Sequence, residues 1–506
     1  MKNVLQYLER TVARVPDRLA ISDGREGQGL TFFELYEGAR RMASALCERG
    51  LCGKRVAILM ERHPATVMAM LGVLYAGACY IPLDVSMPRE RMHGILSRAD
   101  AALLVCDDQS RSLALQMGLA VCSVEELLAA DVDESALAHV RAEQIDTDPI
   151  YIIFTSGSTG VPKGVVGCHR AVIDYAEALI GTLGFEQDCV FGCQSPLYFD
   201  APLKELLTTL AKGATTYLIP KRLFSFPVLL LRYLNEHGIN TICWVSSALS
   251  AVAALGALDA ETPTTLRTVV FGSETLPLKA FYAWREALPR ADFWQLYGPT
   301  EATGMSCYFH VDRPIEPGER IPIGRPFDNT GLILLSEQGE RILPKAGQCS
   351  EAGEILLRGS CLTLGYDHDD RNDECFIQNP LQSAYGERVY RTGDMACYNA
   401  RGELEFLGRK DGQLKRMGHR IETGEIEASA LGLPGVWSAA CLVCGREGKL
   451  TLFYTGEPEQ SQLVRSLGER LPRYLLPDRI QKMSEIPLTD NGKIDRQALA
   501  KRAREE

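Results

Sequence analysis

Apolar and polar residues alternate along residues 55–300 in a pattern that predicts strands and helices following one another. Short apolar runs, such as RVAILM from residue 55 and NTICWV from residue 240, are typical of buried strands. Longer segments between them, such as LKELLTTLAKG from residue 203, have the apolar spacing of helices that end at glycine. The alternation predicts βαβ units, a mostly parallel sheet and therefore an α/β fold.

Beyond about residue 320 the pattern changes. GLILLSEQGERILP from residue 331 and GEILLRG from residue 353 predict short antiparallel strands with glycine-containing turns, which we expect to form a β-barrel-like part. Polar residues interrupt the apolar pattern at residues 409–412, where we place a domain boundary. We therefore expect a large N-terminal domain over residues 1–409 and a small α+β domain over residues 410–506.

The composition narrows the class of protein. The net charge of −11 argues against a nucleic-acid-binding surface, which would need a basic stripe. No apolar run has the length of a membrane span, and the charged, helical start does not resemble a signal peptide. The 16 cysteines are scattered, which favours free thiols in a reducing cytoplasm. Cys441 and Cys444 form a C-x-x-C pair, but on a predicted strand they are better interpreted as core thiols than as a zinc site.

One loop carries candidate phosphate-binding chemistry. It follows an apolar strand at residues 150–154 and contains Thr155, Ser156, Gly157, Ser158, Thr159, Gly160 and Lys163. Small residues let backbone N–H groups surround an anion, and a lysine adds positive charge, so the loop suits a polyphosphate. The P-loop pattern fails, because Pro162 replaces a glycine and Gly164 replaces the Mg²⁺-binding hydroxyl. A solvated Ser/Gly loop is the alternative.

Nine motifs in sequence order place this loop in a wider context. They are LTFFEL at 30, LYAGACYIPLD at 74, FTSGSTGVPKG at 154, FDAPLKE at 199, YGPTE at 297, GEILLRG at 353, YRTGD at 390, GRKDGQLKRMGHRIETGEIE at 408 and PLTDNGKIDRQAL at 487. Together they cover nearly the whole chain. On these motifs the chain resembles the acyl-adenylate-forming ligases and, among them, the amino-acid adenylation domains of nonribosomal peptide synthesis and their free-standing relatives.

The resemblance implies a two-step reaction. A carboxylate attacks the α-phosphate of MgATP, giving an acyl-adenylate and pyrophosphate, and a thiol then accepts the acyl group. ATP and Mg²⁺ are thus the expected cofactors. Residues 155–164, with Lys163, would hold the β- and γ-phosphates, Thr300 would hydrogen-bond the α-phosphate, and Glu301 would bind Mg²⁺, which prefers carboxylate oxygen.

The remaining motif residues have equally definite implied roles. Tyr297, followed by Gly298, would lie near the adenine, and Asp394 would accept hydrogen bonds from the ribose hydroxyls. Lys493 would bridge the attacking carboxylate and the α-phosphate. The resemblance also implies that the small domain is mobile. Asp411 matches the hinge about which it turns, and Gly418 matches the loop used in thiolation.

The substrate pocket is expected around Asp200, which matches the acidic position that pairs with an α-amino group. The other implied pocket residues are Ala201, Lys204, Trp244, Val270, Gly272, Leu296, Gly304 and Met305. An inward-pointing Lys204 would need a counter-charge, so it favours an acidic amino acid such as glutamate. Alternatively, Lys204 faces solvent or pairs with Glu205, and Trp244 shrinks the pocket to fit a small amino acid, as in D-alanine–carrier protein ligases.

Two further expectations concern partners. The chain ends shortly after Lys493, so we expect a stand-alone enzyme that passes its product in trans to the phosphopantetheine thiol of a carrier protein. A coenzyme A ligase for an organic acid is the remaining alternative, but such an enzyme would be expected to lack Asp200.

Overall fold

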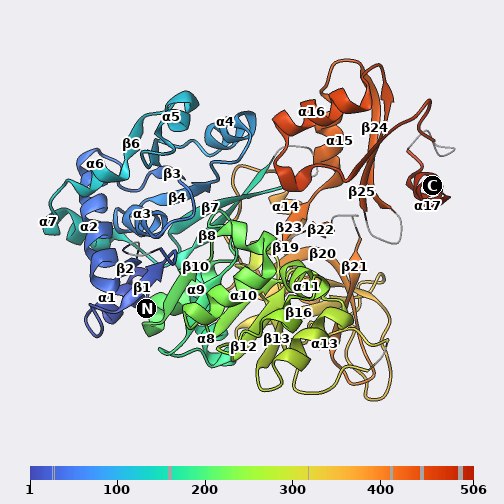
Figure 1. The fold of residues 1–506 in the computed structure, drawn as a ribbon, viewed down its shortest axis with the longest axis horizontal. Helices are drawn as coiled ribbons and strands as arrows, with labels where there is room; N and C mark the ends of the chain where they lie inside the picture. The colour runs from blue at the N-terminus through green and yellow to red at the C-terminus, as the bar shows by residue number, and fades with distance from the viewer. Residues whose placement is uncertain are drawn as a thin grey trace. The chain divides into compact units, whose positions relative to one another are not determined.

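The computed structural model describes residues 1–25, 27, 29–157, 162–316, 318–410, 414–416, 418–444, 449–487 and 494–505 (Figure 1). The chain divides into two compact units. Unit 1 contains Met1–Val85, Ala99–Ile153 and Gly164–Lys410, and unit 2 contains Ser86–Arg98, Phe154–Lys163 and Asp411–Glu506. The main division therefore falls within the stretch where polar residues interrupt the sequence pattern. The two short segments of unit 2 were not predicted.

A seven-stranded sheet occupies the N-terminal half of unit 1. Its order is β18-β8-β7-β4-β3-β5-β6, and the pairs among β7, β4, β3, β5 and β6 are parallel. The apolar runs predicted as strands are present, including the strand before the glycine-rich loop. The strands are β3 (Arg55–Leu59), β4 (Cys79–Leu83), β5 (Leu103–Cys106), β6 (Val121–Ser123), β7 (Pro149–Thr155), β8 (Lys163–Cys168) and β18 (Gly365–Tyr366).

A nine-stranded sheet provides the second layer of unit 1. Its order is β15-β14-β13-β12-β11-β9-β10-β1-β2, parallel from β13 to β1 and antiparallel at both edges. The strands are β1 (Leu19–Ser22), β2 (Gly29–Thr31), β9 (Val190–Cys193), β10 (Thr215–Leu218), β11 (Thr241–Val245), β12 (Thr268–Gly272), β13 (Asp292–Tyr297), β14 (Cys307–His310) and β15 (Arg325–Pro326). The predicted α/β fold is confirmed.

Helices pack against both faces of the nine-stranded sheet, as the βαβ pattern predicts. The end predicted at Gly213 is observed for α9 (Leu203–Lys212), which stops there in the left-handed conformation, and α8 (His169–Leu183) stops in the same way at Gly184. The other longer helices of unit 1 are α1 (Leu5–Val12), α2 (Phe32–Glu48), α3 (Pro64–Tyr75), α7 (Glu134–Glu143), α10 (Pro227–Glu236), α11 (Ser246–Ala254) and α13 (Leu278–Ala287).

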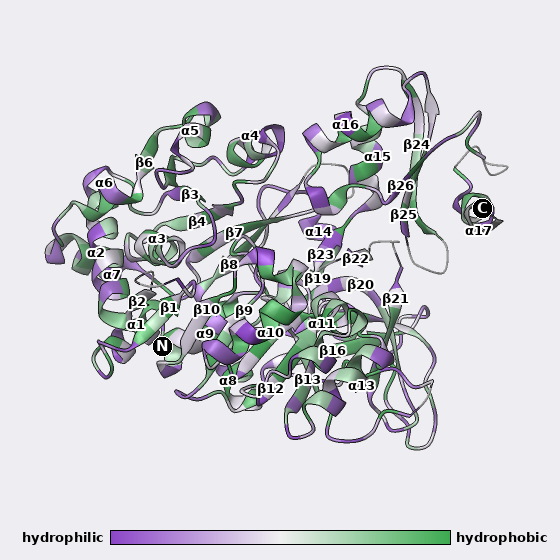
Figure 2. Ribbon diagram, in the orientation of Figure 1, coloured by the Kyte–Doolittle hydropathy of each residue, from purple (hydrophilic) through white to green (hydrophobic). Residues whose placement is uncertain are grey.

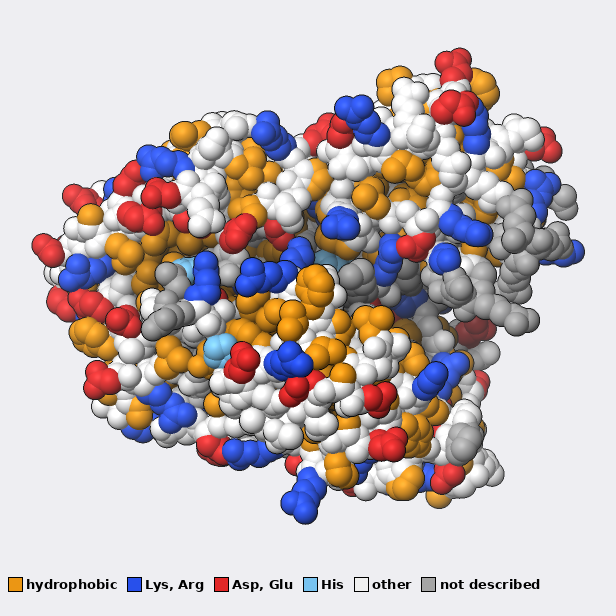
Figure 3. Space-filling view, in the orientation of Figure 1, with side chains coloured by type: hydrophobic (Ala, Val, Ile, Leu, Met, Phe, Trp, Pro, Cys, Tyr) orange, Lys and Arg blue, Asp and Glu red, His pale blue; other side chains and the backbone are white. Residues whose placement is uncertain are grey.

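Two hydrophobic cores lie on opposite faces of the nine-stranded sheet. Strand alternation divides β11 between them, since Cys243 belongs to the core that contains α9 residues and Trp244 to the core that contains Trp284. In Figure 2, hydrophobic residues lie along the central strands of this sheet, such as β12. Opposite charges are interspersed on the face shown in Figure 3.

The predicted β-barrel-like part is a five-stranded antiparallel sheet. Its order is β16-β17-β20-β19, and β21 also pairs with β20. The strands are β16 (Thr330–Leu335), β17 (Gly353–Gly359), β19 (Phe376–Gln378), β20 (Arg388–Tyr398) and β21 (Leu404–Arg409). The long strand β20 carries Asp394, so this sheet positions one of the implied nucleotide-binding residues.

Unit 2 has the predicted α+β character. It contains a hairpin and a three-stranded sheet, and Cys441 and Cys444 lie on β24 as free thiols. Within the described ranges, no group of three or more His, Cys, Asp or Glu side chains could hold a metal ion. The elements are α4 (Arg89–Arg98), β22 (Leu414–Arg416), β23 (His419–Ile421), α15 (Thr423–Leu431), β24 (Val436–Cys444), β25 (Lys449–Gly456), α16 (Gln460–Arg470), β26 (Arg479–Lys482) and α17 (Arg496–Glu505).

A search of the described part of the chain for membrane-crossing helices finds none of sufficient length and apolarity.

The core that contains Trp244 and Trp284, called the second core below, allows a prediction about stability. Trp284 is fully buried, donates its indole N–H to the Leu249 carbonyl and packs edge-on against Trp244. We expect Trp284→Ala to lower the free energy of unfolding by about 3–5 kcal/mol, because it leaves a large cavity. Chemical denaturation measures the change. Trp437, which is 69% exposed, is the matched control, and Trp437→Ala should change the free energy by less than about 0.5 kcal/mol. Equal effects would contradict the assigned core.

Candidate functional site

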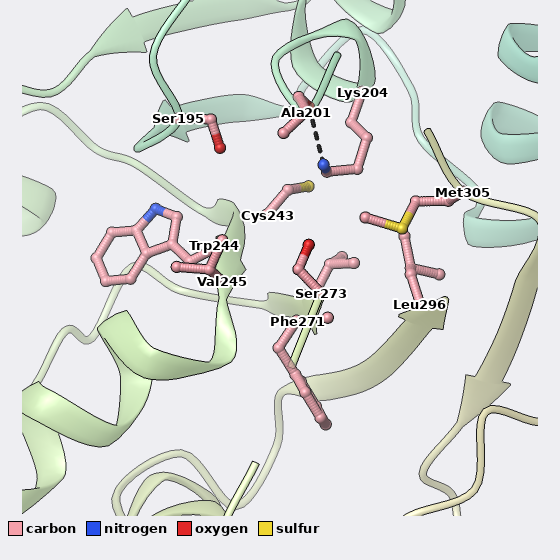
Figure 4. A pocket seen from close by; sticks show the side chains of 12 residues that line it. Ser195, Ala201, Lys204, Cys243, Trp244, Val245, Phe271, Ser273, Leu296 and Met305 are labelled. Atoms are coloured by element: carbon pink, nitrogen blue, oxygen red, sulfur yellow. Dashed lines mark hydrogen bonds between the residues drawn. The ribbon is translucent and has the colours of Figure 1, made fainter. Parts of the chain in front are cut away.

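A small pocket lies where several parallel strands of the nine-stranded sheet end. Strands β11, β12 and β13 each contribute residues at or just beyond their carboxyl ends, and α9 contributes a side chain from its first turn. Ligand sites of open α/β sheets lie at this edge. The lining residues are Ser195, Ala201, Lys204, Cys243, Trp244, Val245, Val270, Phe271, Gly272, Ser273, Leu296 and Met305 (Figure 4).

Most of the residues expected to bind substrate therefore lie together. The exceptions are Asp200 and Gly304, which precede the lining residues Ala201 and Met305 in the chain. These two are close to one another, because a Cβ added at Gly304 would stand 3.9 Å from Asp200 Oδ2. The charge of Asp200 also affects the pKa of two neighbouring tyrosines. Burial raises the pKa of Tyr151 and Tyr175 well above the usual value, and the Asp200 carboxylate raises it further.

Lys204 is the charged residue of the pocket lining. Its side chain leaves α9 into the pocket, is only 4% exposed, and donates from Nζ to the Ala201 carbonyl at 2.8 Å (Figure 4). The alternative in which Lys204 faces solvent is wrong, because the first turn of α9 is buried on that side. A buried ammonium with one neutral hydrogen-bond acceptor is a strong site for an anion.

Trp244 belongs to the pocket lining, but its ring packs in the hydrophobic core that contains Trp284. Its indole N–H donates to the Gly192 carbonyl at 2.8 Å, and its ring packs against Phe224 and Trp284 in the second core. Figure 4 shows the ring turned away from Lys204. Cys243, its neighbour on β11, faces the core on the Lys204 side. Sequence reasoning missed Cys243, although alternation along a strand predicts that neighbours face opposite sides.

Gly272 is required by the spacing of β12 and β13. A Cβ at this position would stand 2.3 Å from the Leu296 carbonyl oxygen, which is backbone and cannot move aside easily. The glycine therefore keeps the pocket floor, formed by these strand ends, closely packed.

A set of hydrogen-bonded side chains in unit 1 joins two sheets. Tyr297, at the end of β13, donates its hydroxyl to Asp394 Oδ2 at 2.5 Å, and Arg409 donates to Asp394 Oδ1 at 2.7 Å. Burial and the Asp394 charge raise the pKa of Tyr297 well above its usual value, so the phenol stays a donor. Two of the implied nucleotide-binding residues, Tyr297 and Asp394, are thus in direct contact.

Glu301 lies a few residues beyond Tyr297, in a short 3₁₀ turn that includes Thr300. Its side chain is fully buried, and Oε1 accepts the Tyr366 hydroxyl at 2.5 Å. The turn is tight at Gly298, where a Cβ would stand 2.5 Å from the Gly304 carbonyl oxygen. One oriented carboxylate fits Mg²⁺, which in nucleotide sites takes one or two protein carboxylates and completes its shell with phosphates and water.

The glycine-rich loop is described only in part. Ser158, Thr159 and Gly160 lie outside the described residues. Ser156 donates its hydroxyl to the Arg420 carbonyl at 2.6 Å, and buried Lys163 lies 3.6 Å from Glu422 Oε1. These contacts are internal to unit 2, to which Thr155 and Gly157 also belong. The Lys163–Glu422 pair was not predicted, and Glu422 would compete with a phosphate for this lysine.

The resemblance assigns roles to three residues of the small domain. Asp411 and Lys493 lie outside the described residues. Gly418 lies in the turn between β22 and β23 with φ of +79°, a conformation that side chains other than glycine disfavour.

Comparisons with known proteins agree with this geometry. Residues 8–367 match the family described as AMP-binding enzyme. The chain is 32% identical, over 98% of its length, to surfactin synthase subunit 2 of Bacillus subtilis (strain 168), of which it covers 14%. It is 36% identical, over 97% of its length, to phosphinothricin tripeptide synthetase PhsC of Streptomyces viridochromogenes, of which it covers 44%. The chain thus spans less than half the length of these curated relatives.

Solved structures show the same fold. One is holo-PA1221, a nonribosomal peptide synthetase protein containing adenylation and peptidyl carrier domains, with a TM-score of 0.84 and 27% identity over 99% of this chain and 84% of that one. Another is the Vibrio cholerae adenylation domain AlmE, with a TM-score of 0.84 and 22% identity over 99% of this chain and 97% of that one. Since the matched region covers most of the sequence and contains the pocket residues and Tyr297, this chain belongs to the AMP-binding enzyme family.

Proposed function

We propose that this chain is an AMP-forming ligase that activates an amino acid, with an acidic amino acid such as glutamate preferred. In the first step, a substrate carboxylate oxygen forms a bond to the α-phosphorus of ATP, and the bond from that phosphorus to the bridging oxygen breaks to release pyrophosphate. In the second, a thiolate attacks the acyl carbon and AMP leaves. Both steps need two anions held in line, so positioning and electrostatics carry the catalysis.

The residues of unit 1 supply part of that positioning. Asp394, oriented by Tyr297 and Arg409, would accept hydrogen bonds from the ribose hydroxyls. Glu301 would hold Mg²⁺, which shields the negative charge of the phosphates when bound. Thr300 would hydrogen-bond the α-phosphate. The resemblance assigns the remaining phosphate contacts to residues 155–164, including Lys163, and the attacking carboxylate to Lys493.

The substrate assignment depends on one observation, the buried Lys204 ammonium in the pocket. Asp200 would bind the α-amino group, and Lys204 would bind a side-chain carboxylate. Leaving a buried ammonium without an ionic partner costs free energy, so a neutral isostere would bind less well. Ala201 is small and adds little bulk beside Lys204, which favours glutamate over a shorter acid.

The acceptor is proposed to be the phosphopantetheine thiol of a carrier protein. Support comes from the relatives, which are peptide synthetases, and from the adenylation and carrier domains named for PA1221. The same thiol chemistry serves a carrier in trans or on the same polypeptide.

The substrate proposal is tested by Lys204→Met. Removing the ammonium while keeping an unbranched side chain should reduce pyrophosphate exchange with glutamate by at least about tenfold, since a lost charged hydrogen bond costs about 1.5–3 kcal/mol. Exchange with alanine or methionine should rise. ATP–pyrophosphate exchange across an amino-acid panel measures both.

Lys212→Met is the matched control, because Lys212 lies at the end of the same helix and pairs with Glu186 at the surface. It should leave the preference unchanged. A wild-type enzyme that prefers alanine, together with an unaltered preference in Lys204→Met, would rule out the acidic substrate. Best use of an organic acid without an amino group would instead indicate a coenzyme A ligase.

The nucleotide role of Asp394 is tested by Asp394→Asn. The amide cannot accept at both positions, so we expect the KM for ATP in pyrophosphate exchange to rise by about tenfold or more, with the KM for the amino acid much less affected. Glu354→Gln is the control, because Glu354 is a buried carboxylate on the neighbouring strand β17 that pairs with Arg391. An equal rise in both variants would indicate a general structural effect.

A further inference from the structure

Glu205 is a fully buried carboxylic acid next to the pocket lysine. It follows Lys204 on α9, is 0% exposed, and among the described residues neither of its carboxylate oxygens has a hydrogen-bond partner. Consecutive residues on a helix point in different directions, so Glu205 lies behind the pocket wall and does not pair with Lys204 directly. A buried carboxylate without hydrogen bonds is costly, so its charge must be balanced nearby or removed by a proton.

Two cations supply that balance from a distance. Lys204 is engaged with the Ala201 carbonyl, and the partly buried Arg62 donates Nη1 to the carbonyls of Gln194 at 2.6 Å and Ser195 at 3.1 Å. Both lower the pKa of Glu205 through their charge. Because neither cation forms an ion pair with Glu205 in the described structure, the carboxyl group is held weakly in either protonation state.

The other titratable groups around Glu205 stay neutral. They come from three further elements, and the Glu205 charge raises the pKa of each. They are Cys193 of β9, Cys243 of β11 and Tyr175 of α8. Burial raises the pKa of all three, above the neutral range in each case. Burial also raises the pKa of Glu205, to about 7, which leaves this carboxyl as the group of the cluster that changes charge near neutral pH.

We propose that Glu205 is a specificity-determining residue of the pocket. When ionised, it balances the Lys204 charge and admits a neutral substrate side chain, whereas when protonated it leaves that charge to the carboxylate of an acidic substrate. The proposal rests on the proposed function, because it concerns the selection of the amino acid that Lys204 contacts. Glu205 does not touch the substrate and acts through Lys204.

The direction of the pH dependence follows from linkage. A substrate carboxylate at Lys204 adds negative charge near Glu205 and raises its pKa above the value in the free enzyme. Binding of an acidic substrate is then favoured where Glu205 is protonated, below about pH 7, and weakens as the pH rises through that value. A neutral substrate does not show this loss.

Glutamate and glutamine are the matched substrates, because they have the same shape and neither side chain titrates between pH 6 and pH 8.5. The measured quantity is the ratio of kcat/KM for the two in pyrophosphate exchange. In the wild-type enzyme this ratio should fall by about tenfold over that range, which corresponds to a shift of one pKa unit on binding. In Glu205→Gln, which keeps the shape and cannot ionise, the ratio should stay high at both pH values.

Glu286→Gln is the control for a carboxyl on an exposed helix position and should behave like the wild-type enzyme. A wild-type ratio that is independent of pH overturns the role of Glu205, whether or not Glu205→Gln folds. So does an unchanged pH dependence in a folded Glu205→Gln. Absence of exchange with glutamate at every pH would instead overturn the substrate proposal, and the Glu205 role with it.

Discussion

The common direction of the parallel strands β9, β11, β12 and β13 is the constraint on which the site depends. Parallel strands end at one edge of their sheet, so residues distant in sequence meet there without any one loop having to reach far. Close spacing of those ends is enforced at Gly272, where a side chain would collide with the Leu296 carbonyl. The pocket is therefore formed by the ends of the sheet strands, and α9 adds the charged side chain of Lys204 to it.

In the part of the chain that the structure describes, the charged side chains in and behind this pocket are buried without forming close ion pairs with one another. Lys204 has a carbonyl acceptor, Arg62 has carbonyl acceptors, and neither forms a close ion pair with Glu205 among the described residues. In such a site each charge changes the proton affinity of the others, because little water screens them. A ligand that brings one more charge would consequently interact with the whole cluster.

The Tyr297–Asp394 contact has a different architecture. It joins the end of β13 in the nine-stranded sheet to the middle of β20 in the five-stranded sheet, with Arg409 of β21 on the other carboxylate oxygen. Two sheets thus hold one carboxylate rigidly. Orientation of this kind suits recognition of a pair of hydroxyls, for which both oxygens must point in a set direction.

The sequence by itself determined the α/β fold and the glycine end of α9, because apolar periodicity is a local property of the chain. Its ordered motifs implied, through the family resemblance, most residues of the pocket. It left open where Lys204 and Trp244 point. Only the packing of α9 turned the lysine inward, and only strand alternation within a two-sided sheet sent the indole into the second core. Glu205, Arg62 and the Lys163–Glu422 pair were likewise outside its reach. Burial of a charge depends on which elements pack around it, and that is decided by tertiary structure.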